Sequence, residues 1–205
     1  MRIVPFYFDN PFDLNSNSYL LVDKSNNCVV IDPSKAKMIL DYIEANHLNL
    51  KAILLTHGHF DHIKGVKFFN VPVYIHKDDV ELLKEPKLNC SDRFCREDIV
   101  VDVTPTLISD DEVLNILDEP IKVIHTPFHS MGSVCFYLKD SDALVSGDTL
   151  FQYSIGRTDF ITSNPNLINS SLAKLMKLPD QTVVYPGHGP KTTIGIERKL
   201  NSFVS

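Results

Sequence analysis

The chain has 205 residues, of which 43% are hydrophobic and 22% charged, and its formal net charge is -6. This size and composition are typical of a soluble globular protein with a single domain over residues 1–205. The negative charge and the lack of a basic stripe argue against nucleic acid as a partner, because binding to phosphates requires clustered lysine and arginine side chains.

Two strands and a helix are the first predicted elements. Residues 17–23 and 27–33 are apolar runs separated by a Lys-Ser-Asn-Asn turn, which predicts two adjacent strands. Residues 34–47 then show the spacing of a helix with one apolar face. The apolar positions of this helix are Ala36, Ile39, Leu40 and Ile43.

The next predicted strand, at residues 51–56, is short and buried and leads directly into a histidine-rich segment. Residues 71–79 predict another strand followed by an acidic helix start. Residues 84–99 are polar and irregular, so they are expected to form a loop or lid that packs little.

Strands dominate the second half of the chain. Residues 121–127, 133–139 and 142–148 predict three strands. Residues 164–179 predict a helix, and residues 181–190 predict a last strand that ends in a glycine loop. This order of elements indicates helices packed outside two stacked sheets.

Neither a membrane span nor a signal peptide is expected. No apolar run approaches the roughly 18 residues that a membrane-spanning helix requires, and Asp9 interrupts the short apolar start of the chain. The expected location is therefore the cytoplasm, with no membrane as partner.

The four cysteines show no spacing typical of a zinc ribbon or a redox motif. Cys28 and Cys135 lie in apolar runs and are expected to be small core residues on strands. Cys90 and Cys95 lie in a polar stretch and are expected to be exposed thiols.

Three histidines and an aspartate crowd into the segment LLTHGHFDHIKG, residues 54–65. Further candidate ligands follow the ends of later predicted strands, each with a glycine nearby. Loops held by a rigid sheet commonly carry chemical sites, and glycine lets the backbone approach a crowded centre. The candidate metal ligands are His57, His59, Asp61, His62, His129, Asp148 and His188.

Spacing within this segment predicts two metal ions. On an extended segment His57 and His59 point the same way, whereas the adjacent Asp61 and His62 diverge. One ion would take the first pair and a second ion the other pair, and zinc needs about four ligands per ion. The remaining ligands are assigned as follows: His129 to the first ion, His188 to the second, and Asp148 as a bridge between them.

Four motifs, in the order THGHFDH, HTPFHSMGS, SGDTLF and YPGHGP, resemble those of the metallo-β-lactamase superfamily. The segments GDTLFQYSIGRTDF and GHGPKTTIGIER are similar to the short glyoxalase II-like (hydroxyacylglutathione hydrolase-like) hydrolases, which lack a C-terminal helical domain. The resemblance implies an α/β fold, a four-layer αβ/βα sandwich of two mixed β-sheets flanked by helices. It also implies a dinuclear site at one sheet edge and thioester hydrolysis, with S-lactoylglutathione as the reference substrate.

The motifs depart from the family pattern in a few places. HTPFHSMGS stands where HTPGHTPGS is usual, and Phe128 beside His129 is expected to narrow the substrate pocket. The helical domain that supplies basic glutathione-binding residues in full-length glyoxalase II is not expected in this protein. Thioester chemistry is therefore better supported than specificity for glutathione.

The ligand set suggests a mechanism for the hydrolysis of an acyl thioester. A hydroxide that bridges two divalent ions, with zinc favoured and iron or manganese also suitable, would attack the thioester carbonyl. Asp61, a metal ligand, is also a candidate catalytic residue that orients the hydroxide. Arg157 is the candidate for binding a substrate carboxylate, and the alternative is that it only braces Asp159.

Several other polar residues have structural interpretations. Asp32 could support a ligand histidine or simply form a turn at a strand end. His125 is expected to pack or to support a ligand rather than to bind metal, and His76 is expected on the surface. The aspartates expected to be ordinary solvated carboxylates are Asp13, Asp78, Asp79, Asp110 and Asp111.

Two functions compete with thioester hydrolysis. A persulfide dioxygenase would use one iron held by His57, His129 and Asp148, since two histidines and a carboxylate suit non-heme iron. A non-catalytic metal-binding protein is the other, and the complete ligand set argues against it. β-Lactamase and nuclease activities are less favoured. The native metal, the acyl group, the thiol carrier and the oligomeric state stay open at this point.

Overall fold

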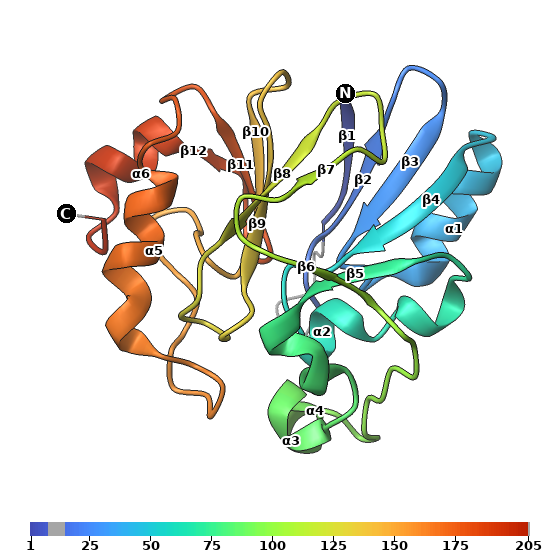
Figure 1. The fold of residues 1–205 in the computed structure, drawn as a ribbon, viewed down its shortest axis with the longest axis horizontal. Helices are drawn as coiled ribbons and strands as arrows, with labels where there is room; N and C mark the ends of the chain where they lie inside the picture. The colour runs from blue at the N-terminus through green and yellow to red at the C-terminus, as the bar shows by residue number, and fades with distance from the viewer. Residues whose placement is uncertain (8–14, 205) are drawn as a thin grey trace.

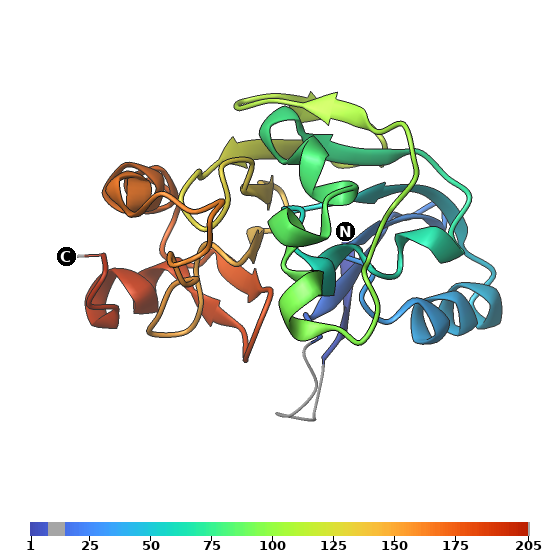
Figure 2. The same ribbon diagram turned by 90° about the horizontal axis from the view of Figure 1, so that it is seen from below.

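The computed structural model describes residues 1–7 and 15–204, and it stacks two six-stranded β-sheets between outer layers of helices (Figure 1). Both sheets are mixed, because each contains parallel and antiparallel strand pairs. The predicted four-layer αβ/βα sandwich is therefore confirmed. Figure 2 shows α1 (Ala36–Ala45) on one side of the pair of sheets and α5 (Ile168–Leu175) with α6 (Ile194–Leu200) on the other.

The first sheet is built from the N-terminal half of the chain, with its strands in chain order. The first three strands pair antiparallel and the last four pair parallel. Its strands are β1 (Arg2–Phe6), β2 (Ser18–Val22), β3 (Asn27–Ile31), β4 (Asn49–Leu54), β5 (Val73–His76) and β6 (Thr106–Ile108). The short helices that follow its strands are α2 (Phe60–Ile63), η1 (Val66–Phe68), η2 (Lys77–Leu83), α3 (Pro86–Asn89) and α4 (Ser91–Phe94).

The second sheet is built from the C-terminal half and has the order β12-β11-β10-β9-β8-β7. Its only parallel pair among the described residues joins β10 to β11, and α5 lies on the connection between them. Its elements are β7 (Val113–Leu114), β8 (Ile121–His125), β9 (Val134–Leu138), β10 (Ala143–Gly147), η3 (Pro165–Leu167), β11 (Val183–Pro186) and β12 (Thr192–Thr193).

Alternating side chains of the central strands feed two different cores. On β2, Tyr19 and Leu21 pack between the two sheets, whereas Leu20 and Val22 pack under the α1 layer. The same alternation on β9 places Phe136 between the sheets and Cys135 under α5. Because both faces of these strands are covered, their sequences are continuous apolar runs, as in the predicted buried strands. Cys28 and Cys135 are buried on strands as predicted.

Residues 84–99 differ from the prediction of a loose polar lid. They contain α3 and α4, and Asn89 at their centre is fully buried. The Asn89 amide donates to the carbonyls of Leu82 and Ile99, which ties this segment to the first sheet's helical layer. Cys90 is also buried, with a relative exposure of 3%, so the expectation that its thiol is exposed is wrong. Cys95 has an intermediate exposure. A polar sequence became a packed segment because its polar groups bond to backbone atoms.

Besides the short helices α2, α3 and α4, four strands and the helix α6 were not predicted from the sequence. β1, β6, β7 and β12 lie at the edges of the sheets. The strands β6, β7 and β12 are only two or three residues long, which is too short for a period-2 pattern to be recognised. The helix α6 follows the short strand β12 at the C-terminal end of the chain. None of the helices in the described part of the chain has the length and hydrophobicity needed to cross a membrane.

His76 is buried, with a relative exposure of 2%, and so the expectation that it lies on the surface is wrong. Its ring stacks on that of His125 with centroids 3.9 Å apart, and its Nδ1 accepts a hydrogen bond from the backbone N–H of Asp78 at the start of η2. Burial, together with the facing His125 ring, lowers the pKa of His76 to about 4. The ring is therefore neutral at neutral pH.

The neutral His76 ring predicts a loss of stability in mild acid. Its pKa of about 4 lies below the usual 6.5, so its contribution to the free energy of unfolding is fully present above pH 6.5 and is lost as the pH falls through 4. We expect His76→Asn, which keeps an oxygen to cap η2, to remove about 1–3 kcal/mol of this pH dependence. Urea unfolding at stepped pH measures it, with exposed His47→Asn as the matched control. An unaltered slope with pH in His76→Asn would contradict the assignment.

Candidate metal centre

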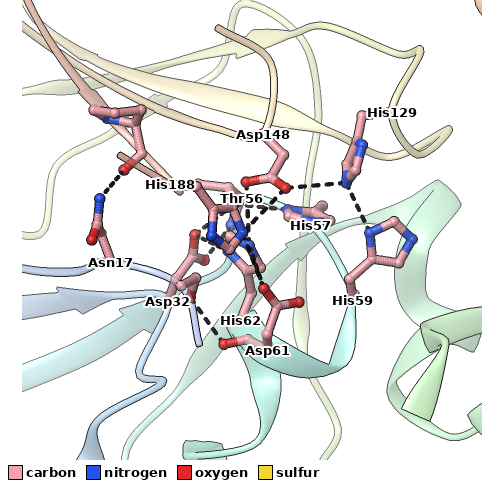
Figure 3. Close-up of polar contacts among 12 residues, drawn as sticks. Asn17, Asp32, Thr56, His57, His59, Asp61, His62, His129, Asp148 and His188 are labelled. Carbon is pink, nitrogen blue, oxygen red and sulfur yellow. Dashed lines mark hydrogen bonds and ion pairs between the residues drawn. The ribbon is translucent and has the colours of Figure 1, made fainter. Parts of the chain in front are cut away.

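Seven side chains from four parts of the chain meet beyond the C-terminal ends of β4, β8, β10 and β11 (Figure 3). Four histidines of the centre are almost fully buried, and the most exposed member of the set is His188, whose side chain is 40% exposed. The set comprises all the residues that the sequence singled out as candidate ligands, namely His57, His59, Asp61, His62, His129, Asp148 and His188.

The first group consists of His57, His59 and His129, and the nitrogen atoms that these rings offer lie within 4.8 Å of one another. Nδ1 of His59 and Nε2 of His129 are 2.9 Å apart. This group is the set that the sequence assigned to a first ion.

The second group consists of Asp61, His62 and His188. Nε2 of His188 lies 3.1 Å from Oδ2 of Asp61, and Nε2 of His62 lies 3.6 Å from the same oxygen. The expectation that Asp61 and His62 diverge is therefore wrong. Both lie on α2 rather than on an extended segment, and neighbouring side chains on a helix are only about 100° apart.

Asp148 lies between the two groups. Its Oδ1 is 3.3 Å from Nε2 of His62, and its Oδ2 is 3.4 Å from Nε2 of His129 and 3.5 Å from Nε2 of His188. A carboxylate with its two oxygens turned toward two ligand groups can bridge a pair of cations. A side chain on Gly187 would collide with this carboxylate, which explains the glycine beside His188.

Unpartnered buried atoms show that this donor set fits metal ions. Nε2 of His57 is buried without a hydrogen-bond partner, and Nε2 of His62 and Oδ1 of Asp148, although 3.3 Å apart, are also buried and form no hydrogen bond. Burying such atoms unpaired costs free energy, and all three face the same centre. Neutral imidazole nitrogens and carboxylate oxygens are the donors that zinc, iron and manganese accept. The cluster is therefore suited to binding two metal ions.

Asp32 supports two of the histidines, which decides between the two interpretations of this residue. Its Oδ2 lies 2.7 Å from Nδ1 of His62 and accepts a hydrogen bond from the Thr56 hydroxyl at 2.6 Å. That hydroxyl is 3.1 Å from Nδ1 of His57. Because Nδ1 of each ring points at an oxygen acceptor, Nδ1 carries the proton. The lone pair of Nε2 is then free and faces the centre.

Asp79 is fully buried, so the expectation of a solvated carboxylate is wrong. Its oxygens accept hydrogen bonds from the backbone N–H of Gly58 at 2.9 Å, the backbone N–H of Gly132 at 2.7 Å and the Ser130 hydroxyl at 2.6 Å. Gly58 lies between two ligand histidines, and Ser130 follows His129. Asp79 therefore joins the two loops that carry the first ligand group.

Asn17 is a second contributor that sequence reasoning missed. Its side-chain amide donates to the carbonyl of Pro186, the contact drawn for Asn17 in Figure 3. The same amide also donates to the carbonyl of Gly189, and the Asn17 backbone N–H donates to the carbonyl of Gly187. These bonds tie the start of β2 to the loop that carries His188. In the sequence, Asn17 could be recognised only as a polar residue directly before a buried strand. That position does not indicate that its partners lie about 170 residues further along the chain.

The acid–base state of the centre follows from burial and from the mixture of charges. Burial lowers the pKa of His57 well below its usual value, and burial beside His129 lowers the pKa of His59 to about 3. Burial alone would raise the pKa of Asp148, but the neighbouring His188 and His62 hold it well below its usual value. Burial alone would lower the pKa of His62 and of His188, but the neighbouring Asp61 and Asp148 carboxylates raise both. Because metal binding requires neutral imidazoles, an ion at the second ligand group would displace protons from these two rings.

A cleft of about 390 Å³ opens beside the cluster. Arg157 lines it, with its guanidinium bonded to both oxygens of Asp159 at 2.6 Å and lying 4.6 Å from the centroid of the Phe160 ring. The bracing alternative is thus present in the structure, and carboxylate binding stays a prediction. Phe128 is fully buried in the core under α5, so the expectation that it narrows the pocket is wrong.

Comparison with known families and curated proteins gives consistent matches. The family described as the metallo-beta-lactamase superfamily matches residues 11–188. The chain is 37% identical over 198 residues to the probable metallo-hydrolase YqgX of Bacillus subtilis (strain 168), a match covering 94% of this chain and 93% of that protein. It is 33% identical over 196 residues to the hydroxyacylglutathione hydrolase GloC of Haemophilus influenzae, with 92% of each chain covered.

Two solved structures share this fold over nearly their whole length. The BLEG-1 B3 metallo-beta-lactamase superposes with a TM-score of 0.92 at 36% identity, covering 100% of both chains. TTHA1623, solved in a di-iron-bound form, superposes with a TM-score of 0.86 at 32% identity and covers 98% of this chain and 100% of that chain.

Proposed function

The chain belongs to the metallo-β-lactamase superfamily, and on that premise we propose that it is a metal-dependent hydrolase of acyl thioesters. The observation that carries the proposal is the pair of ligand groups that share Asp148 at the side of a cleft. The similarity to a hydroxyacylglutathione hydrolase over almost the whole chain supports the thioester class.

The residues present would divide two ions between them. His57, His59 and His129 would hold one ion, Asp61, His62 and His188 the other, and Asp148 would contact both. Divalent ions held in such a site lower the pKa of water to about 7 and polarise a carbonyl oxygen. Zinc is our first choice for the native metal, and the di-iron form of TTHA1623 supports iron as the second.

The protein's own groups orient the reactants. Asp61 lines the cleft, so its carboxylate can accept a hydrogen bond from water and direct it toward a bound carbonyl. Asp32 holds the His62 ring in place through Nδ1, so that its other nitrogen stays directed at the centre. A thiolate is a good leaving group and needs no strong general acid. Thioester cleavage therefore makes a small demand on the residues around the cleft.

Metal analysis of the purified protein, combined with a panel of acyl thioesters, tests this function. We expect two ions per chain and hydrolysis of S-lactoylglutathione or of coenzyme A esters, with activity abolished by a chelator and restored by zinc or iron. Protein with two ions per chain that cleaves no thioester would refute the proposal. One iron per chain with oxygen consumption on glutathione persulfide would instead favour the dioxygenase alternative.

A second candidate function is hydrolysis of β-lactams. The observation that favours it is the match to a B3 metallo-beta-lactamase over the full length of both chains. A chromogenic cephalosporin assayed beside the thioesters, on the same metal-loaded protein, separates the two. A kcat/KM for the cephalosporin above that for every thioester would replace the proposed function with this one.

Arg157→Ala is expected to raise KM for S-lactoylglutathione about fivefold to tenfold while changing kcat less than twofold. Both partners of the Arg157–Asp159 pair are more than half exposed, so the pair opens at little cost and a substrate carboxylate can replace Asp159. Lactoyl-N-acetylcysteamine, whose carrier has no carboxylate, is the control and should keep its KM. Unchanged KM for both substrates would mean that Arg157 only braces Asp159.

A further inference from the structure

The cleft beside the cluster has two chemically different walls. One wall is formed by five of the candidate ligands, and the other is mainly apolar. With a volume of about 390 Å³, the cleft lies at the small end of the range for small-molecule sites. The apolar lining residues are Phe60, Cys90, Phe94, Phe151, Ile155 and Phe160.

Aromatic rings from three segments frame the approach to the cluster. Phe60 of α2 and Phe94 of α4 stack with centroids 5.9 Å apart and planes 22° apart. Phe160 stands edge-on to His59 at 4.8 Å, and Phe151 stands edge-on to His188 at 6.0 Å. A group that reaches the metal ligands therefore passes between the faces and edges of phenylalanine rings.

The polar groups of the apolar wall already have partners. The Arg157 guanidinium, more than half exposed, bonds Asp159. Burial raises the pKa of the Cys90 thiol to about 11, so it is a neutral, weakly polar group at neutral pH. The Ser154 hydroxyl lies 3.5 Å from the Ile155 carbonyl. The wall thus offers apolar surface to a bound group, with its one charge toward solvent.

We propose that this cleft takes the acyl group of the substrate and selects an apolar acyl group, above all one with an aromatic ring, over the short hydroxylated lactoyl group. The inference rests on the proposed thioester hydrolysis. An acyl chain between these rings leaves water for an apolar surface, whereas a hydroxyl group there loses its hydrogen bonds to water. Arg157 at the exposed side is left for the thiol carrier.

Hydrophobic burial sets the size of the expected preference. Each methylene group buried in the cleft should raise kcat/KM about fourfold. A ring packed against another ring adds about twofold to tenfold. We therefore expect the phenylacetyl thioester to exceed the acetyl thioester by at least about tenfold, and lactoyl to resemble acetyl.

The test uses thioesters of one uncharged carrier, N-acetylcysteamine, so that only the acyl group changes. Acetyl, lactoyl, butyryl, hexanoyl and phenylacetyl esters are assayed with the metal-loaded wild-type protein. A rise in kcat/KM from acetyl to phenylacetyl supports the inference. A lactoyl ester cleaved faster than the phenylacetyl ester overturns the inference but leaves thioester hydrolysis standing. If no ester of any carrier is cleaved, the proposed function itself has failed.

Variants of the aromatic wall supply a second, independent test. Phe94, 40% exposed, can be changed with little risk to folding, and Phe94→Ala should lower kcat/KM for phenylacetyl about tenfold and for acetyl less than threefold. Phe94→Leu, which stays apolar, should recover part of the loss. Phe68→Ala is the matched control, because Phe68 is 60% exposed on η1 and does not line the cleft. Equal losses on all esters in Phe94→Ala would contradict selection by this ring.

Discussion

The Asp148→Asn variant is expected to lower kcat/KM by about 10²–10³-fold and to reduce the bound metal from two ions per chain to one or none. Its carboxylate faces both ligand groups, with one oxygen 3.3 Å from His62 and the other 3.4 Å from His129. Asparagine has the same shape but replaces one oxygen with an amide nitrogen that donates hydrogen bonds and is a poor ligand. The centre therefore loses the negative charge that both ion positions share, and one of them loses a ligand oxygen.

Mass spectrometry measures the metal content per chain, and steady-state kinetics measures the loss of kcat/KM. Asp111→Asn is the matched control, because the Asp111 side chain is 77% exposed and pairs with Lys122, which is not one of the candidate ligands. Thermal unfolding establishes that Asp148→Asn is folded. Two ions per chain with turnover near that of the wild type would show that Asp148 is not a bridge.

Asp79→Ala is expected to lower the free energy of unfolding by about 3 kcal/mol or more and to weaken metal binding about 10–100-fold. The substitution leaves the buried N–H groups of Gly58 and Gly132 without an acceptor, and the Ser130 hydroxyl keeps only its contact with the Ser133 hydroxyl at 2.8 Å. Those donors belong to the loops that carry His57, His59 and His129, so their release changes the ligand positions as well as the stability.

Urea unfolding and competition with a metal chelator separate the two consequences. Asp79→Asn keeps one acceptor oxygen and should lose less of both quantities, whereas a role in packing alone would leave the metal dissociation constant unchanged. Asp78→Asn is the matched control, since Asp78 is the adjacent residue and its side chain is 42% exposed. A wild-type metal affinity in folded Asp79→Ala would contradict the positioning role.

The ligand set could be predicted from the sequence because its chemistry leaves little choice of residue. Histidine and aspartate at the ends of apolar runs, each beside glycine, have few uses other than metal binding, and the structure brings all seven together. The central strands and α1 were also predictable, since burial on both faces of a strand produces a continuous apolar run and burial on one face of a helix produces a period of about 3.6 residues. These features depend on local chemistry and on the regular geometry of the backbone.

Which polar residues are covered was decided only by the tertiary structure. Asp79 resembles its neighbour Asp78 in the sequence, but it is buried because the loop around Ser130, some fifty residues further along the chain, folds over it and supplies donors. His76 and Cys90 were likewise assigned to the surface from polar neighbours.

Contacts between distant segments decided the remaining assignments as well. Asp32 bonds His62, Asn17 bonds the loop of His188, and Phe128 packs into the core beside a ligand histidine instead of lining the cleft. The direction of a side chain in an irregular loop follows from whichever surface the loop meets, and no local period encodes that surface. The sequence by itself thus determined the metal-binding chemistry and the layered strands, whereas the supports of the centre and the apolar wall of its cleft arose from packing between segments far apart along the chain.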